Sequence, residues 1–238
     1  MDRPGFKFKT HWALTLLLAA LAVLFVSLGN WQRERAEEKR ALQSDFDAAR
    51  SVAALEPGLT NWTRAELVGG LDPRRHVLLD NKIHRGRAGV HVLTPFQPAG
   101  GPAVLVNRGW LPLPPDRSRL PSVPTPEETL VLSGRLAPLS RPGVQVGEPV
   151  QLETDRWPQL IVYPDWGRLE AALGLALHRQ VLYLDADSPA GFADRAWTPF
   201  TMTPDRHMAY AVQWYGLALA AAATWVVLGV TAGRRAAA

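Results

Sequence analysis

The amino-acid sequence predicts a membrane protein in which two transmembrane helices at the chain ends bracket an exported α+β domain of mainly antiparallel β-structure. Three observations lead to this prediction: two long apolar segments, basic tails outside them, and short β-branched runs separated by Pro, Gly and Asp. The predicted parts are a cytoplasmic tail (residues 1–11), a first transmembrane helix (12–31), an exported β-rich domain with a helical stalk (32–206), a second transmembrane helix (207–231) and a second cytoplasmic tail (232–238).

The first apolar segment runs from Trp12 to Trp31. At a rise of about 1.5 Å per residue, a helix of this length spans roughly 28 Å, close to a hydrocarbon core of about 30 Å. A tryptophan at each end fits the interfacial aromatic belts. A cleaved signal peptide is the alternative, but the apolar run exceeds a usual signal core and the A-x-A of Ala20–Ala22 lies in its middle. We therefore expect an uncleaved anchor.

The second apolar segment, from Met208 to Thr231, carries no charged residue and predicts a tilted span. The two tails together contain five basic residues and one acidic residue, so they hold the whole net charge of +4 and the stretch between the spans is neutral. By the positive-inside rule, both termini face the cytoplasm and the central domain is exported. The neutral domain argues against a nucleic-acid partner, although the sequence pI is about 9.8. The absence of cysteine excludes disulfides, thiol catalysis and thiolate metal sites.

The exported part begins with a charged stretch rich in helix formers, in which Arg33/Glu37 and Arg35/Glu38 have ion-pair spacing. It predicts that the first helix continues as a solvated stalk to about Arg50. A second helix is predicted in the run PDWGRLEAALGLAL, which begins at Pro164 and Asp165. The proline-rich segment 111–125 predicts a loop. The expected strands are Thr63–Gly69, His76–Ile83, Gly89–Thr94, Ala103–Trp110, Thr129–Leu136 and Gln180–Asp185.

No enzyme is predicted, because the chain lacks a G-x-S-x-G elbow, a P-loop, an H-E-x-x-H motif and a Gly-rich dinucleotide fingerprint. A membrane-bound hydrolase therefore lacks a nucleophile constellation. His84 and His91 flank a turn between predicted strands without a further ligand at a recognised spacing, so we expect structural histidines rather than a metal site.

The exported ends of the two spans offer a more specific candidate. Thr203, Pro204 and Asp205 predict a helix start that places His207 just inside the membrane helix. His207, Tyr210, Ala211 and Trp214 share one helical face, and the first span ends in Trp31 and Gln32, with Arg35 one turn further. If the spans pack, as the small pair Gly216 and Ala220 suggests, His207 neighbours Trp31, Gln32 or Arg35. Two interpretations remain open: a histidine bonded to water or lipid, and a haem ligand with Arg35 or Arg206 on the propionates.

Four segments of the chain resemble the Surfeit locus protein family, membrane factors for the assembly of cytochrome c oxidase. They occur in the family's order and cover nearly the whole chain: Leu28-Gly29-x-Trp31-Gln32-x-x-Arg35-x-x-x-Lys39, Gly89-Val90-His91-Val92-Leu93-Thr94-Pro95, Val104-Leu105-Val106-Asn107-Arg108-Gly109-Trp110-x-Pro112, and His207-x-x-Tyr210-Ala211-x-Gln213-Trp214.

The resemblance implies an assembly factor that binds haem a at the exported face of a bacterial inner membrane and aids its insertion into the oxidase. It makes His207 the candidate iron ligand, and the implied haem-binding set is His207, Trp31, Gln32, Arg35, Tyr210 and Trp214. The implied partners are the oxidase subunit that houses haem a, haem a synthase and the lipid bilayer. The alternative is a scaffold that stabilises an assembly intermediate without haem. In the third motif we expect Gly109 and Trp110 to form a tight turn beside a buried indole, and Arg108 to contact a partner.

Overall fold

The computed structural model describes residues 8, 10–48, 51–52, 55, 59–114, 117, 119–140 and 152–235. The chain forms two compact units. The first, here the helix unit, comprises Met1–Asp45 and Pro199–Ala238, and the second, the β unit, comprises Phe46–Thr198.

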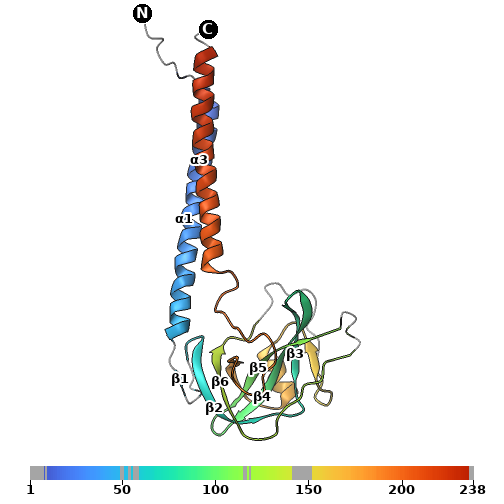
Figure 1. Ribbon diagram of the computed structural model, residues 1–238. Helices are drawn as coiled ribbons and strands as arrows, with labels where there is room; N and C mark the ends of the chain where they lie inside the picture. The colour runs from blue at the N-terminus through green and yellow to red at the C-terminus, as the bar shows by residue number, and fades with distance from the viewer. Residues whose placement is uncertain are drawn as a thin grey trace, which may run out of the picture. The chain divides into compact units, whose positions relative to one another are not determined.

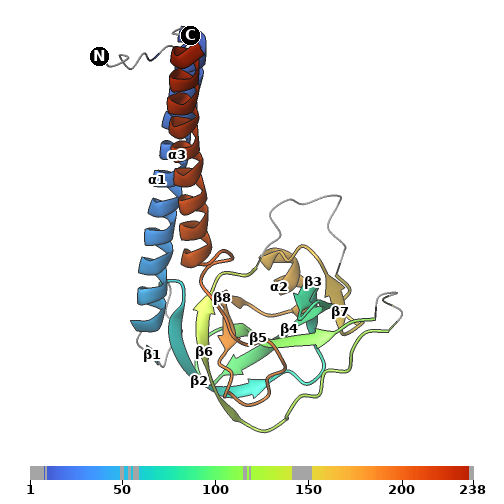
Figure 2. The same ribbon diagram turned by 45° about the horizontal axis from the view of Figure 1, so that its top comes forward.

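Two long helices account for most of the described residues of the helix unit, α1 (Trp12–Ala48) and α3 (Pro204–Arg235). They run antiparallel and side by side, so the start of α1 and the end of α3 lie at the same end of the pair (Figures 1 and 2). Both are long and apolar enough to cross a membrane by length and composition. The helix start predicted for α3 is confirmed, since the Arg206 amide donates to Thr203 Oγ1 at 3.4 Å and Asp205 lies in the first turn.

The face of α3 that packs on α1 follows steps of four and three residues, the spacing of an antiparallel coiled coil. Its members are His207, Ala211, Trp214, Ala218, Ala221 and Trp225, which are buried or half-buried. Contacts fix the register at three levels: Gln32 with His207, Phe25 with Trp214, and Thr15 with Trp225.

In its described residues the β unit contains eight strands and a short helix. The strands are β1 (Ser51–Val52), β2 (Thr63–Leu71), β3 (Val77–His84), β4 (Arg87–Pro98), β5 (Ala103–Pro112), β6 (Leu130–Ala137), β7 (Gln159–Ile161) and β8 (Leu177–Leu184). They form one sheet in the order β1-β2-β6-β8-β5-β4-β3-β7. Residues 69–71 of β2 also pair with residues 96–98 of β4, which closes β2, β6, β8, β5 and β4 into a ring.

The sheet is mixed, so the prediction of a mainly antiparallel domain needs correction. The pairs β1–β2, β3–β7 and β5–β8 are parallel. The pair β5–β8 is the decisive one, because the chain leaves β5, forms β6, β7 and α2, and then returns to run beside β5 in the same direction. Such a crossover is set by long-range packing rather than by local strand pattern.

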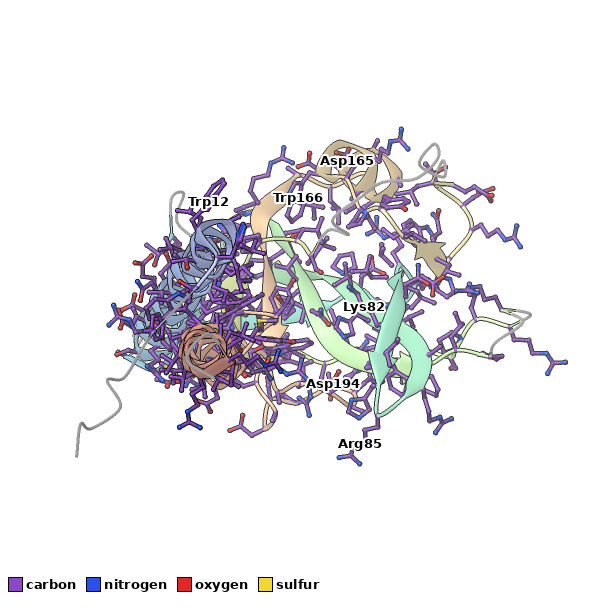
Figure 3. All side chains as sticks on the ribbon, turned by 90° about the horizontal axis from the view of Figure 1, so that it is seen from above. Trp12, Lys82, Arg85, Asp165, Trp166 and Asp194 are labelled. Carbon is purple, nitrogen blue, oxygen red and sulfur yellow. The ribbon has the colours of Figure 1, made fainter. Side chains whose placement is uncertain are left out.

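The helix α2 (Trp166–Leu173) confirms the prediction made from its sequence. Its N-cap Asp165 accepts from the Arg168 amide, and Gly174 ends it in the left-handed conformation at φ 66°. Figure 3 labels Asp165 and Trp166 at the start of this helix. Leu169 and Leu173 are buried in the same core cluster as residues of β3, β5 and β8, so one face of α2 covers the sheet.

Candidate functional site

The structure brings together His207 and Gln32, two of the residues predicted to form the site. The imidazole Nδ1 of His207 lies 2.8 Å from Oε1 of Gln32, and His207 is 9 % exposed. An amide oxygen only accepts hydrogen bonds, so Nδ1 donates in this contact. A neutral imidazole protonated at Nδ1 keeps its lone pair on Nε2, the arrangement found in histidines that bind metals.

Trp31 and Arg35 lie on an exposed side of α1 next to this contact. Trp31 is 47 % exposed, and the Arg35 guanidinium lies 6.0 Å from the centre of its ring. Arg35 also donates to Glu38 at 2.7 Å, and the Arg33–Glu37 pair is present at 3.8 Å, as the stalk sequence predicted. Both ion pairs are exposed and contribute little stability. Arg35 thus offers a positive charge beside an open aromatic face.

Trp214 and Tyr210 take different positions from one another on α3. Trp214 stacks on Phe25 with ring centres 5.8 Å apart, so it belongs to the packed interface. Tyr210 is 44 % exposed and turns away from that interface. Of the six predicted residues, His207, Gln32 and Trp214 face the partner helix, whereas Trp31, Arg35 and Tyr210 present open surface.

Two residues beside the site were missed from sequence. The Tyr215 hydroxyl donates to Asn30 Oδ1 at 2.7 Å, and the Tyr215 ring lies over Gly29. A Cβ at Gly29 would come 2.5 Å from Cε1 of Tyr215, so only glycine allows this approach. The sequence could have indicated this contact, because Gly29 and Asn30 belong to the motif that ends the first span and Tyr215 directly follows Trp214.

Arg108 is buried rather than available to a partner, which corrects its predicted role. Its side chain is 1 % exposed and donates to Ala190 O, Thr125 Oγ1 and Pro124 O at 2.6–2.7 Å. Its guanidinium also lies 4.6 Å from the ring of Phe192. Burial lowers the pKa of Arg108 to about 10. These contacts tie two irregular segments to β5, so the role of Arg108 is structural.

Gly109 and Trp110 follow in the same strand, at a bulge instead of the predicted tight turn. Between the pairs His91–Trp110 and Leu93–Asn107, β5 contains one residue more than β4. Gly109 takes φ 106°, and the Trp110 amide then donates to Ala193 O at 2.7 Å. The expected buried indole is confirmed, since Trp110 is 5 % exposed and donates from Nε1 to Lys82 O.

The histidines of the β unit have structural partners. Asn107 Nδ2 lies 3.4 Å from Nδ1 of His91, which therefore accepts and carries its proton on Nε2. Burial, aided by the positive charge of Lys82, lowers the pKa of His91 to about 4. His84 pairs with Asp194 at 3.2 Å beside the β3–β4 hairpin, whose tip is marked by Arg85 in Figure 3. Among the described residues, no group of three or more His, Cys, Asp or Glu side chains could hold a metal ion.

Comparison with known proteins decides the family. A model of the SURF1 family matches residues 19–219, which include every residue of the His207 site. The chain belongs to the SURF1 family. This confirms the resemblance inferred from the four sequence motifs. SURF1 proteins are generally known as cytochrome oxidase assembly factors and are not a classical enzyme family.

Several relatives are similar over nearly the whole chain. Uncharacterized SURF1-like proteins of Mycobacterium tuberculosis and Mycobacterium bovis are each 27 % identical over 235 residues, which cover 93 % of this chain and 84 % of theirs. A SURF1-like protein of Monosiga brevicollis is 27 % identical over 255 residues, covering 94 % of this chain and 89 % of the relative. The similarity therefore extends over both units.

Proposed function

We propose that this SURF1 protein is a membrane-anchored assembly factor that holds haem a as cargo, with His207 as the iron ligand, and aids its insertion into cytochrome c oxidase. In this proposal α1 and α3 span a bacterial inner membrane, both termini are cytoplasmic, and the β unit lies on the exported side. The cargo passes to the oxidase subunit that houses haem a, and haem a synthase is the donor.

The observation that carries the proposal is the hydrogen bond between His207 Nδ1 and Gln32 Oε1. It places a proton on Nδ1 and orients the ring, so that Nε2 is the nitrogen available to iron. Removal of the hydrogen-bond partner of a metal-binding histidine typically lowers the metal affinity about 10- to 100-fold. Nε2 of His207 is therefore a suitable ligand for haem iron, which takes histidine as an axial ligand in many proteins.

The surroundings of His207 supply the other features that a haem needs. Trp31 and Tyr210 offer exposed aromatic faces, and Arg35 and Arg206 offer positive charge for the propionates. Arg35 already bonds Glu38, but a guanidinium has five donors and can hold a second carboxylate. Since His207 is only 9 % exposed, binding of the macrocycle requires the ends of α1 and α3 to separate locally.

The same burial favours one rival function, a scaffold that stabilises an oxidase assembly intermediate without haem. A polar contact buried between two membrane helices can serve adhesion alone, at about 0.6 kcal/mol for an average pair. The two functions make different demands on His207, because the scaffold needs only its contact with Gln32, whereas the haem carrier needs the Nε2 atom as well.

An absorption spectrum of the full chain purified from cells that make haem a tests the choice. We expect a haem spectrum in the wild type, its loss in His207→Ala and its retention in His11→Ala, a matched histidine at the other end of the helix unit. Gln32→Leu should bind haem about 10- to 100-fold more weakly. An unchanged spectrum in His207→Ala removes this ligand, and a wild type without haem supports the scaffold.

Membrane topology can be tested with single cysteines because the chain has none of its own. A membrane-impermeant maleimide should label Arg85→Cys in spheroplasts, since Arg85 is exposed at the tip of the β3–β4 hairpin. Arg234→Cys should react only after lysis. Labelling of Arg234→Cys in intact spheroplasts contradicts the proposed orientation.

A further inference from the structure

The end of the helix pair opposite His207 contains an open cavity of about 630 Å³ that the proposed function does not use. It lies between the first turn of α1 and the last two turns of α3. Leu14, Leu228 and Ala232 give it an apolar wall, whereas His11 and Arg235 give it a basic rim. A cavity of this size is in the range that holds small organic ligands.

The two halves of the cavity fall at different depths relative to a bilayer. His11 directly precedes Trp12, which is 72 % exposed and occupies the position of an interfacial aromatic residue. The basic rim is therefore level with lipid headgroups. Leu14 lies about one turn deeper than His11, and Leu228 lies about two turns deeper than Arg235, where acyl chains begin. Helical side chains tilt toward the helix N-terminus, so Arg235 at the end of α3 reaches back toward His11.

The charge at this end is uncompensated within the part of the chain that the structure describes. No acidic residue occurs in α1 before Glu34 or in α3 after Asp205, and both of these lie near the other end of the pair. Arg3, Lys7, Lys9 and Arg234, set against the single acidic residue Asp2, add further net positive charge to the two tails. The cavity thus meets the cytoplasmic leaflet with a positive potential, which attracts anionic headgroups.

A second cavity, of about 270 Å³, provides a contrast. It lies further along the pair between Leu18, Ala22 and Ala221, and no charged side chain lines it. The polar atoms at its edge, Trp225 Nε1 and Thr15 Oγ1, bond one another at 3.1 Å. It has the character of ordinary lipid-facing surface, whereas the first cavity combines an anion-binding rim with an apolar wall.

The geometry points to a binding site for an anionic glycerophospholipid in the first cavity, with the phosphate on Arg235 and His11 and the start of an acyl chain along Leu14 and Leu228. The apolar wall selects a lipid over a free phosphate. This inference rests on the proposed membrane placement of the helix unit and adds a ligand at its cytoplasmic end.

Native mass spectrometry of the full chain in detergent, titrated with phosphatidylglycerol or phosphatidylcholine, tests it. We expect tighter binding of phosphatidylglycerol, a loss of about fivefold in Arg235→Gln, and little change in Arg234→Gln, which removes the same charge one residue away. Ala232→Phe fills the cavity and should weaken binding as well.

Three results overturn the inference: equal losses in Arg234→Gln and Arg235→Gln, equal affinity for the two lipids, or displacement of the lipid by inorganic phosphate at matched concentration. The haem spectrum of the same wild-type sample separates this inference from the proposed function. A sample without haem that still selects phosphatidylglycerol rejects the haem proposal and supports the lipid site.

Discussion

Replacement of Gly109 by alanine should destabilise the β unit without touching the helix unit. Gly109 has φ 106°, a backbone conformation that L-residues rarely adopt. A Cβ at this position would lie 2.4 Å from the carbonyl oxygen of Ala193 and 3.0 Å from Cγ of Arg195. The first of these atoms belongs to the backbone, so the chain at residues 192–193 has to move away from β5.

The expected cost follows from two effects. A residue held in a sparsely populated backbone region costs about 1–3 kcal/mol. Movement of Ala193 also breaks the 2.7 Å bond from the Trp110 amide, which is worth about 0.5–1.5 kcal/mol. Together they predict a loss of about 2–4 kcal/mol. For a protein of this size the melting temperature should then fall by about 4–16 °C.

Tryptophan fluorescence during thermal unfolding of the full chain in detergent measures this change, because Trp62, Trp110 and Trp197 all report on the β unit. The matched control is Gly70→Ala in β2, where an added Cβ has nothing within 4 Å and the glycine φ is not positive. The control should melt within about 2 °C of the wild type. If the two variants melt alike, the strain and the clash at Gly109 are not what the structure implies.

Two further predictions concern one residue in each unit. Gly29→Ala should destabilise the helix pair by about 1–3 kcal/mol, because the new Cβ overlaps the Tyr215 ring. The control Gly216→Ala, whose Cβ would have nothing within 4 Å, should leave the stability unchanged. Denaturation in detergent, followed by circular dichroism, compares the two variants, and equal stability argues against the packing at Gly29. His91 has a folded pKa of about 4 against an ordinary 6.5, so the stability present above pH 6.5 is lost as the pH falls toward 4, by roughly 3 kcal/mol in all. Urea unfolding across this range should show the loss in the wild type and a flatter dependence in His91→Gln; parallel curves contradict the assignment.

Local sequence patterns were sufficient to predict the elements that depend on contacts between residues close in sequence. The N-cap of α2 needs only Asp165, which accepts from the Arg168 amide three residues later, and the C-cap needs only Gly174. The Arg33–Glu37 pair likewise depends on helical spacing alone. Such signals act within one or two turns, so they can be recognised without knowledge of the rest of the chain.

Strand direction and the burial of Arg108 depend on segments that are distant in sequence. Asn107 pairs with Tyr183 in the parallel β5–β8 ladder, and nothing in either strand specifies that direction. The strands β1 and β7, of two and three residues, are too short to give a period of their own. Arg108 is satisfied by two carbonyls and a hydroxyl from irregular segments, which no spacing rule predicts.

The interface between α1 and α3 shows why helical periodicity located the candidate site but did not resolve its parts. Spacing on one isolated helix groups His207, Tyr210, Ala211 and Trp214 together. Contact with a second helix selects a narrower stripe with steps of four and three, which keeps His207, Ala211 and Trp214 and leaves Tyr210 at its edge, 44 % exposed.

The difference between buried residues inside this stripe and exposed residues at its edges has a consequence for the proposed function. Residues inside the stripe, His207 with Gln32 above all, can change partners only if the helices separate, whereas the residues at its edges, Trp31 and Tyr210, are accessible in the closed pair. A planar ligand therefore meets the aromatic edge before it meets the imidazole. If the pair binds haem as proposed, stacking on Trp31 and Tyr210 would precede coordination, and the bond to His207 would have to offset the cost of opening the helix ends. A pure scaffold binds no haem, so mutation of Trp31 and Tyr210 should alter haem uptake only if the haem proposal holds.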